Sequence, residues 1–287
     1  MESQKIIALV VTYNRLELFK KTIEGLRNQT RKPNQILVVN NSSTDGTDLW
    51  LSEQTDLKVI TQPNIGSSGG QYTGSKEAMK ENPDWIWLMD DDVIPTEYCL
   101  ENLIKFAGEN KIIAPLRQTP NGDVFLNDTI IFNLNNPFKS IWTRILSKND
   151  LENDLIAADG ITFEGPMIHK DVFLKIGYPE KNFFIYGDDS EFFIRAKKSG
   201  FNSFIAVKAL LKRQLEAPLN EHIFTWKHFF MIRNIIVIDL LHASIIVKLL
   251  RPWGYLITWL KRAKSKEDFK AVIQGFISAY FYKSVIK

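Results

Sequence analysis

Three consecutive aspartates, Asp90–Asp92, directly follow the apolar run "WIWLM" (85–89). Burial and mutual repulsion both oppose keeping three charges at the end of a buried strand. Carboxylates one residue apart on an extended chain point to the same side, so Asp90 and Asp92 can together address one hard cation or its water shell. The sequence therefore predicts a positive partner there. Acids would also favour a helix starting near Pro95, but such capping needs one carboxylate.

A second acidic cluster, Asp188, Asp189 and Glu191, lies within "YGDDSEFF" (186–193). A carboxylate can act as a general base that takes a proton from a hydroxyl group. Adjacent carboxylates can raise each other's pKa, and the sequence does not say which of the two titrates. The same residues fit the acidic first turn of an amphipathic helix that continues to Lys198, and that helix does not exclude a catalytic role.

Short apolar runs alternate with helical patterns through the first part of the chain. We expect strands at 5–11, 35–39, 57–60 and 85–89, and helices at 15–29, from about 47 to 54, and from the end of a Gly/Ser loop (64–70) to about 81. This order predicts a mainly parallel α/β sheet covered by helices. Ligands of such sheets bind beyond the carboxyl ends of the strands. The polar segments "TYN", "NNSSTDG" and "DDD", which follow three of the strands, should therefore converge on one crevice.

The rest of the chain is less regular and then strongly helical. Further strands are expected at 111–115, 128–134, 160–168 and 201–207, with a helix after Asp188. From about Glu221 the sequence is helical and rich in Ile, Leu, Phe and Trp. We therefore divide the chain into a domain at 1–220 and a helical region at 221–287.

Composition indicates a globular protein with an uneven charge distribution. The 287 residues are 45% hydrophobic and 24% charged, enough for one substantial core. The single cysteine, Cys99, excludes an intramolecular disulfide, and the N-terminal apolar run is too short for a signal peptide, so a cytoplasmic protein is expected. Residues 245–287 carry nine basic and two acidic side chains, net +7, whereas residues 1–244 carry net −4. The two parts should meet different partners, and we expect no nucleic acid among them.

Six segments resemble a known enzyme family. They are "VVTYNR", "VVNNSSTDGT", "NIGSSGGQYTG", "WLMDDDV", "FEGPMI" and "FFIYGDDSEFFIRA", and they occur in the order seen in inverting family 2 glycosyltransferases of the GT-A fold. The resemblance covers about residues 5–235. The triple aspartate, the glycine-rich segment and "FMIRN" near 230 are most similar to the galactofuranosyltransferase and rhamnosyltransferase branches.

The resemblance implies a sugar transfer that uses a divalent cation. The donor would be a nucleotide diphosphate sugar, whose leaving group develops negative charge that Mn²⁺ or Mg²⁺ can stabilise. Asp92 would be the direct metal ligand, Asp90 would lie nearer the sugar or ribose and also address the metal, and Asp91 would have a supporting role. His222 is the candidate for a further metal ligand. If it is not one, Lys212 or Arg213 would meet the diphosphate as a fixed charge.

The resemblance also assigns a base and a donor pocket. Asp189 would deprotonate the acceptor hydroxyl, with Asp188 and Glu191 positioning the acceptor or the base. Glu164 and Gly165 would lie beneath the sugar, although a simple bend in a strand is the alternative. A neutral residue, Asn40, stands where the family often has Asp, which leaves the base of the nucleotide open. The remaining residues expected to contact the donor are Thr12, Tyr13, Asn14, Arg15, Asn41, Asp45, Gly66, Gly69 and Gly70; the alternatives are an ordinary strand-to-helix turn and a flexible glycine-rich connector.

Two other functions compete with this interpretation. "WIWLMDDDVI" also resembles the strand and DxD motif of haloacid-dehalogenase-type phosphatases, in which Asp90 would be the nucleophile. That motif normally ends the first strand of its fold, whereas three strand and loop units precede it here. A non-catalytic scaffold that binds nucleotide sugars is the second alternative, although Asp90, Asp92 and Asp189 are all present. The favoured donors are UDP-galactofuranose and dTDP-rhamnose, and the acceptor would be a glycan or a lipid-linked glycan.

The C-terminal region carries an apolar stripe next to basic residues. The residues of the stripe are Phe269, Val272, Ile273, Phe276, Tyr280 and Phe281, at helical spacing after the basic segment "WLKRAKSK" (259–266). Such a pattern is typical of a helix that lies in the surface of an anionic membrane. The stripe could instead pack on the catalytic domain or join two copies in a homo-oligomer.

Overall fold

The computed structural model describes residues 4–108, 110–216 and 224–286. These residues form a nine-stranded sheet in the order β3-β2-β1-β4-β10-β6-β11-β5, with β9 pairing β11. The strands are β1 (Ile6–Thr12), β2 (Gln35–Asn40), β3 (Leu57–Thr61), β4 (Trp85–Asp90), β5 (Val93–Pro95), β6 (Ile112–Gln118), β9 (Leu155–Ala157), β10 (Met167–His169) and β11 (Ser203–Arg213). Strands β1 to β4 pair in parallel, and so do β6 and β11, while β5, β9 and β10 run antiparallel to their neighbours. The predicted mainly parallel α/β sheet is thus confirmed.

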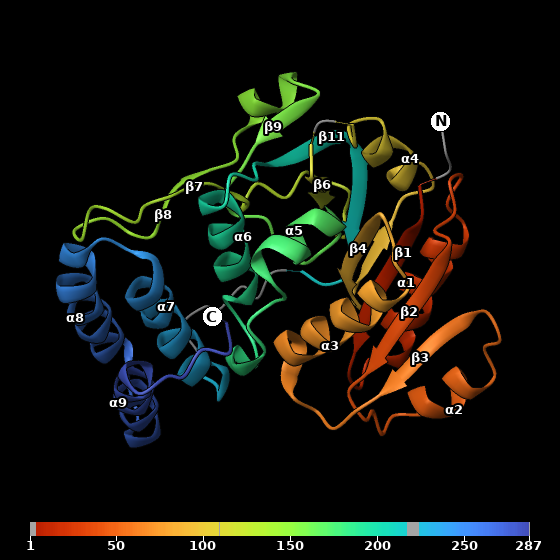
Figure 1. Cartoon of the computed structure of the whole chain (residues 1–287). Helices are drawn as coiled ribbons and strands as arrows, with labels where there is room; N and C mark the ends of the chain where they lie inside the picture. The colour runs from red at the N-terminus through yellow and green to blue at the C-terminus, as the bar shows by residue number, and fades with distance from the viewer. Residues whose placement is uncertain (1–3, 109, 217–223, 287) are drawn as a thin grey trace.

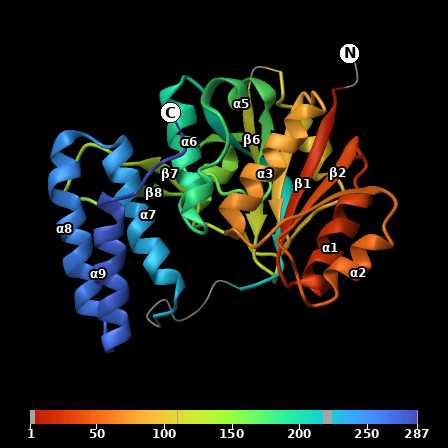
Figure 2. The ribbon, with the colours of Figure 1, turned by 60° about the horizontal axis from the view of Figure 1, so that its bottom comes forward.

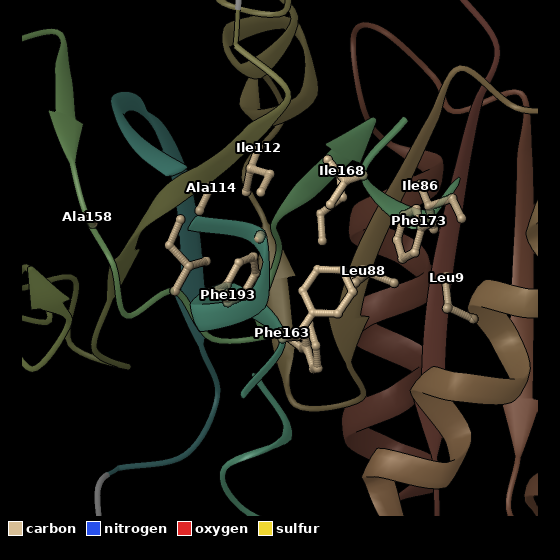
Figure 3. Close-up of a cluster of buried hydrophobic side chains, with 14 of the residues drawn as sticks. Leu9, Ile86, Leu88, Ile112, Ala114, Ala158, Phe163, Ile168, Phe173 and Phe193 are labelled. Carbon is tan, nitrogen blue, oxygen red and sulfur yellow. The ribbon is translucent and has the colours of Figure 1, made fainter. Parts of the chain in front are cut away.

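Helices cover both faces of the sheet because its central strands are apolar on both sides. In β1, Ile7 and Leu9 face one core, whereas Ala8 and Val10 face the other. Helices α3, α5 and α6 cover the first face, where Phe163, Phe173 and Phe193 gather (Figure 3), and α1, α2 and α4 cover the second. The helices are α1 (Leu16–Arg27), α2 (Thr47–Ser52), α3 (Gly66–Lys80), α4 (Cys99–Ile104), α5 (Lys170–Ile176) and α6 (Asp188–Lys198), and short 3₁₀ turns are η1 (Lys148–Glu152) and η2 (Lys181–Phe183).

Two predicted segments differ from the structure. The expected Gly/Ser loop (64–70) is mostly helical, because α3 already begins at Gly66. The expected strand at 160–168 is reduced to β10, because Gly165, with φ +95°, bends the chain before it. The segment 128–134 contributes β7 (Thr129–Phe132), which pairs with β8 (Trp142–Ile145) in a separate hairpin.

The C-terminal helices form a group beside the α/β sheet (Figures 1 and 2). They are α7 (Lys227–His242), α8 (Ile245–Arg262) and α9 (Lys266–Tyr280). Three residues from outside these helices also belong to their shared core. They are Ile141 near the β7–β8 hairpin, Phe183 of η2 and Ile194 of α6. Within the described ranges, none of the helices is long and apolar enough to cross a membrane. The expected domain boundary at 220/221 lies outside the described residues.

Candidate active site

The carboxyl ends of β1, β2 and β4 lie side by side at one edge of the sheet. Thr12 pairs with Asn40, and Val11 pairs with Asp90. The polar segments that follow these strands therefore meet, as the alternation of strands and helices predicts. This edge is where ligands of open α/β sheets bind.

Asp91 joins the ends of β1 and β4. Its Oδ2 atom accepts hydrogen bonds from the Thr12 hydroxyl at 2.9 Å and from the Tyr13 backbone N–H at 3.2 Å. The main-chain oxygen of Asp91 accepts a further bond from the Thr22 hydroxyl at 2.9 Å. Asp91 is buried with 4% exposure, whereas the ring of Tyr13 is 43% exposed and open to a ligand. These contacts agree with a supporting role for Asp91.

Arg15 lies against two of the three aspartates. Its Nη1 atom donates to Asp91 Oδ1 at 3.1 Å and to Asp92 Oδ2 at 2.6 Å. Asp90 instead accepts a weak hydrogen bond from the Gln71 side chain, at 3.4 Å. Arg15, expected to contact the donor, therefore pairs with two of the three aspartates in this structure.

The side chains of the neighbouring loops are largely used to hold those loops. Asn14 accepts from the Thr44 backbone N–H at 2.6 Å, and the Asn41 amide donates to the Gly66 carbonyl at 3.1 Å. Asp45 accepts from the first N–H of α1, that of Leu16, at 2.8 Å. Asn14, Asn41 and Asp45 were expected to bind the donor; the structure shows that their side chains hold the loops at this edge of the sheet, and direct donor contacts from them remain a prediction.

The glycines of α3 have a packing role that differs from the expected one. A Cβ atom on Gly70 would lie 2.3 Å from Val11 Cγ1, and one on Gly69 would lie 2.4 Å from Ile65 Cγ1. Gly66 has φ +80°, and a Cβ there would lie 2.0 Å from the Phe184 carbonyl oxygen. The glycines therefore let α3 approach β1 and the Phe184 backbone closely. Their expected approach to a phosphate or sugar remains a prediction.

The second acidic pair begins helix α6. Asp188 and Asp189 are its first two residues, and they follow Gly187, which has φ +82°. Burial and the adjacent Asp189 raise the pKa of Asp188 to about 7. Burial also raises the pKa of Asp189, although the Ser190 N–H opposes this. Asp188 lies close enough to the first cluster that its charge helps to raise the pKa of Asp90.

Glu164 is held between two arginines at the edge of the site. Its Oε2 atom accepts from Arg117 Nη1 at 2.7 Å and lies 3.3 Å from Arg213 Nε. Arg117 is 5% exposed and also pairs with the buried Asp128. Both guanidinium groups stack over the ring of Phe125 at 4.6 Å. Sequence reasoning named Glu164 and Arg213 but missed Arg117 and Asp128. Arg117 lies within β6 and Asp128 directly precedes β7, and no local sequence motif distinguishes either residue.

The electrostatics of the site favour binding of a cation. Burial, then repulsion by Asp92 and Glu164, raises the pKa of Asp90 well above its usual value. Burial raises the pKa of Asp92 as well, and the charges of Arg15 and Arg213 only partly oppose this. Several partly buried carboxylates that share one space resist ionisation until a positive charge joins them. Their oxygen atoms are the ligands that Mg²⁺ and Mn²⁺ prefer, so the residues fit a hard divalent cation.

One expected residue has its side-chain partners outside this cluster. Glu191, expected to position the acceptor or the base, instead accepts from Arg195 Nε at 2.7 Å and lies 2.9 Å from His242 Nε2. It is 1% exposed, so it links α6 to the end of α7. Its side chain is used to join these two helices, and its expected role in positioning the acceptor or the base remains a prediction. His222 lies outside the described residues.

The part of the chain that the structure describes contains no group of three His, Cys, Asp or Glu side chains arranged to hold a metal ion. Mg²⁺ sites in phosphate-transferring proteins commonly use one or two carboxylates, with substrate phosphates and water completing the shell. Asp90 and Asp92 would be the two carboxylates of a site of that kind.

A family model described as "Glycosyl transferase family 2" matches residues 7–177. The chain belongs to this family. The galactofuranosyltransferase GlfT1 of Mycolicibacterium smegmatis is 24% identical over 213 residues, covering 69% of this chain and 67% of that protein. The O-antigen chain rhamnosyltransferase WbaN of Salmonella anatum is 24% identical over 147 residues, covering 50% of this chain and 46% of that protein.

Solved glycosyltransferase structures share the fold. The crystal structure of GalNAc-T7 with UDP, GalNAc and Mn²⁺ superposes with a TM-score of 0.69 at 10% identity, covering 96% of this chain and 55% of that one. The structure of S. aureus TarS 1–349 gives a TM-score of 0.57 at 17% identity, covering 96% and 81%. The GT-A fold expected from the sequence is confirmed, with helices added after the sheet. A phosphatase of the haloacid-dehalogenase type is not supported.

Proposed function

We propose that this family 2 member transfers a sugar, with inversion, from a UDP- or dTDP-linked donor to a glycan or lipid-linked acceptor in cell-surface polysaccharide synthesis. One observation carries the proposal: the two acidic clusters lie near each other, because Asp188 repels Asp90 and Glu164 repels both Asp90 and Asp189. Transfer of this type needs both a site for the leaving diphosphate and a base for the acceptor. Galactofuranose and rhamnose are favoured because relatives that transfer these sugars match the chain.

Each cluster would have its own task. Asp92, with Asp90, would hold Mn²⁺ or Mg²⁺, which stabilises the charge that develops on the leaving diphosphate. Asp189 would take the proton of the acceptor hydroxyl while that oxygen attacks the anomeric carbon. Asp91 would keep the two strand ends together, as its bonds to Thr12 and Tyr13 indicate. Arg213, which lies 3.3 Å from Glu164, would add a fixed positive charge near the diphosphate.

A donor screen and a base variant test this assignment. Native-state ligands raise thermal stability, so UDP or dTDP with Mn²⁺ should raise the melting temperature more than either component alone. Incubation with UDP-galactofuranose or dTDP-rhamnose and an acceptor extract should release UDP or dTDP without free phosphate. Asp189→Asn should keep nucleotide binding and lose roughly 10²–10⁴-fold in turnover. Release of inorganic phosphate would indicate a phosphatase, and nucleotide-sugar binding without turnover would indicate a scaffold.

The C-terminal helices expose an apolar face that differs from the predicted stripe. Val272 is fully buried, and Phe276 packs on Trp253 with ring centroids 5.1 Å apart, so these two residues hold α9 within the helix group. A longer exposed face lies on α8, and we call it the α8 face. Its residues are Ile245, Ile246, Leu249, Leu250, Trp253 and Ile257. The remaining exposed residues of the predicted stripe are Phe269, Ile273, Tyr280 and Phe281.

We further propose that the α8 face lies on an anionic membrane surface, on its cytoplasmic side. Residues 245–266 contain no acidic side chain, and basic residues at 261, 262, 264 and 266 follow the apolar face directly. Each basic residue near an anionic leaflet contributes on the order of 1 kcal/mol, in addition to apolar burial. An anionic lipid surface matches both the charge and the apolar character, and it would bring the active site to a lipid-linked acceptor.

Vesicle sedimentation tests the membrane proposal. The intact chain should bind vesicles that contain phosphatidylglycerol and not pure phosphatidylcholine vesicles at low salt. Leu249→Ser with Ile257→Ser should lower binding at least about tenfold, because each removes well over 1 kcal/mol of apolar burial. Leu49→Ser is the matched control, since Leu49 is 70% exposed on α2, within the other part of the chain. If all variants bind the vesicles equally, the lipid contacts another surface of the protein. If the protein is a dimer that Leu249→Ser converts to a monomer, the α8 face binds a second copy and not a membrane.

A further inference from the structure

The loop that leads into α6 has an unusual backbone. Phe184 and Tyr186 both have φ +67°, and Gly187 has φ +82°. Positive φ angles in residues with large side chains are strained and persist only where the surroundings enforce them. This loop immediately precedes Asp188 and Asp189, so whatever enforces its shape also sets where the two carboxylates lie.

Helix α7 holds the loop from one side through two adjacent residues of the "FMIRN" segment. The Asn234 side-chain amide donates to the carbonyl groups of Phe183, Ile185 and Tyr186, at 3.1, 2.9 and 2.7 Å. Asn234 is 1% exposed, and its Oδ1 atom accepts from Arg233 Nε at 2.8 Å, which fixes the orientation of the amide.

Arg233 adds two bonds to the same loop. Its Nη2 atom donates to the carbonyl groups of Asn182 and Phe183, at 2.8 and 2.9 Å. Its guanidinium also lies over the Phe230 ring at 5.0 Å, and that ring stacks on Phe184 at 4.9 Å. Loop carbonyls that lack strand or helix partners are thereby satisfied from α7.

Helix α3 holds the loop from the other side. The Ser68 backbone N–H donates to the Phe184 carbonyl at 3.2 Å. Gly66 allows this approach, because a Cβ there would lie 2.0 Å from the same oxygen. The loop is therefore fixed between an element that packs on β1 and one that belongs to the C-terminal helices.

We propose that Asn234, oriented by Arg233, is a positioning residue for the catalytic base: it holds the 182–187 loop, and thereby keeps Asp188 beside Asp90 and Asp189 beside Glu164. The C-terminal helices are then part of the active-site framework. This inference rests on the proposed function for its catalytic part. Because Asn234 binds the loop rather than the substrate, its loss should affect turnover much more than donor binding.

Amide hydrogen exchange of the intact chain and a double-mutant cycle test the proposal. Asn234→Ala should increase exchange in peptides covering 182–190 at least tenfold and lower turnover of UDP-galactofuranose or dTDP-rhamnose by about 10²-fold, since small misplacements of catalytic groups have effects of that size. The affinity for UDP with Mn²⁺ should change less than threefold. In an Asp189→Asn background, Asn234→Ala should cost less than threefold, because the two residues act as one unit.

Asn133→Ala is the matched control. Asn133 also donates its side-chain amide to three loop carbonyls, those of Asn136, Lys139 and Ser140, but beside the β7–β8 hairpin. This variant should loosen its own loop and leave turnover unchanged. If Asn234→Ala does not fold, Arg233→Met replaces it in the double-mutant cycle, and turnover should then fall about tenfold.

Three outcomes would overturn the proposal. If amide exchange at 182–190 is unchanged in Asn234→Ala, Asn234 does not restrain the loop. If exchange increases and turnover stays normal, the restraint is purely structural. Turnover losses that add fully to those of Asp189→Asn show that Asn234 does not act through the base. If the wild-type chain turns over no nucleotide sugar, the proposed function and the catalytic part fail together, while exchange still reports on the loop restraint.

Discussion

At the scale of single residues, the site concentrates acidic groups that the folded protein does not fully neutralise. Arg15 binds Asp91 and Asp92, whereas Asp90 accepts a hydrogen bond from the neutral side-chain amide of Gln71. Burial raises the pKa of Asp90 well above its usual value, so its ionised form opposes folding at neutral pH. A bound cation would remove this cost, which links stability to metal binding.

Asp90→Asn should therefore change stability in opposite directions with and without metal. The folded-state pKa of Asp90 is raised, so its destabilising effect is absent below the unfolded pKa of about 4 and grows as pH increases above that value. Without metal at pH 7 the variant should melt a few degrees higher than the wild type, and near pH 4 the difference should vanish. With millimolar Mn²⁺ and UDP the wild type should gain stability and the variant should not.

Thermal unfolding by calorimetry across pH 4–8 measures both effects. Asp56→Asn is a suitable control, because Asp56 pairs with Arg27 on the surface and precedes β3, at the opposite end of the strands from Asp90. A Mn²⁺-dependent increase in melting temperature that survives in Asp90→Asn would show that Asp90 is not needed for the cation. Asp92→Asn, examined in the same way, separates the direct ligand from its neighbour.

The residues of the site were predictable where their position depends on local sequence. Asp90–Asp92 could be placed because they end an apolar run in a regular alternation of strands and helices. Arg117 could not, because its partners Asp128 and Glu164 are 11 and 47 positions away. The contact between Glu191 and His242 was not predictable for a related reason, because the two residues are 51 positions apart and lie on different helices.

At the scale of elements, α3 shows why a glycine-rich segment can be a helix. Glycine disfavours a helix interior by about 1 kcal/mol relative to alanine, so the segment 64–70 reads as a loop. The structure makes it helical because only glycine lets the helix axis approach β1, where side chains of Leu9 and Val11 occupy the space of the missing Cβ atoms. Tertiary packing outweighs local propensity here, and no short-range pattern reveals it.

Gly70→Ala and Gly254→Ala should have opposite effects on stability. Both glycines lie inside helices, but a Cβ at Gly70 would lie 2.3 Å from Val11 Cγ1, whereas one at Gly254 meets nothing within 4 Å. Overpacking should cost Gly70→Ala about 1–3 kcal/mol, and helix propensity should stabilise Gly254→Ala by up to about 1 kcal/mol. Urea denaturation measures both. A Gly70→Ala variant as stable as the wild type would contradict the close-packing role of α3.

At the scale of the whole molecule, the C-terminal helices are joined to the α/β domain at several separate places. Lys198 Nζ donates to the His242 carbonyl at 2.6 Å, and Glu180 accepts from the Val285 N–H at 2.9 Å. Arg251 of α8 donates to the Asn133 carbonyl at 2.9 Å, beside the hairpin that reaches toward α8 in Figure 1. With the contacts of α7 to the loop before Asp188, these links predict that both parts unfold together.

Arg251→Met tests whether the two parts unfold together, because Arg251 binds both Asp239 of α7 and the Asn133 carbonyl beside the hairpin. It pairs through Nε and Nη2 with Asp239, and the two residues are 3% and 0% exposed. Removing one partner leaves a buried unpaired charge, so the variant should lose about 3–5 kcal/mol at pH 7, still in a single transition.

The pH dependence and two comparison variants make the expectation specific. Burial already raises the pKa of Asp239, and loss of Arg251 should raise it further, so the penalty should shrink as pH falls toward the ordinary carboxyl pKa. Arg251→Met with Asp239→Leu should recover most of the loss, because neither charge remains buried. Arg27→Met breaks an equally bidentate pair with Asp56 on the surface and should cost at most about 1 kcal/mol. Two separate transitions in Arg251→Met, with the sheet domain as stable as before, would instead show that the helices unfold independently of the active site they border.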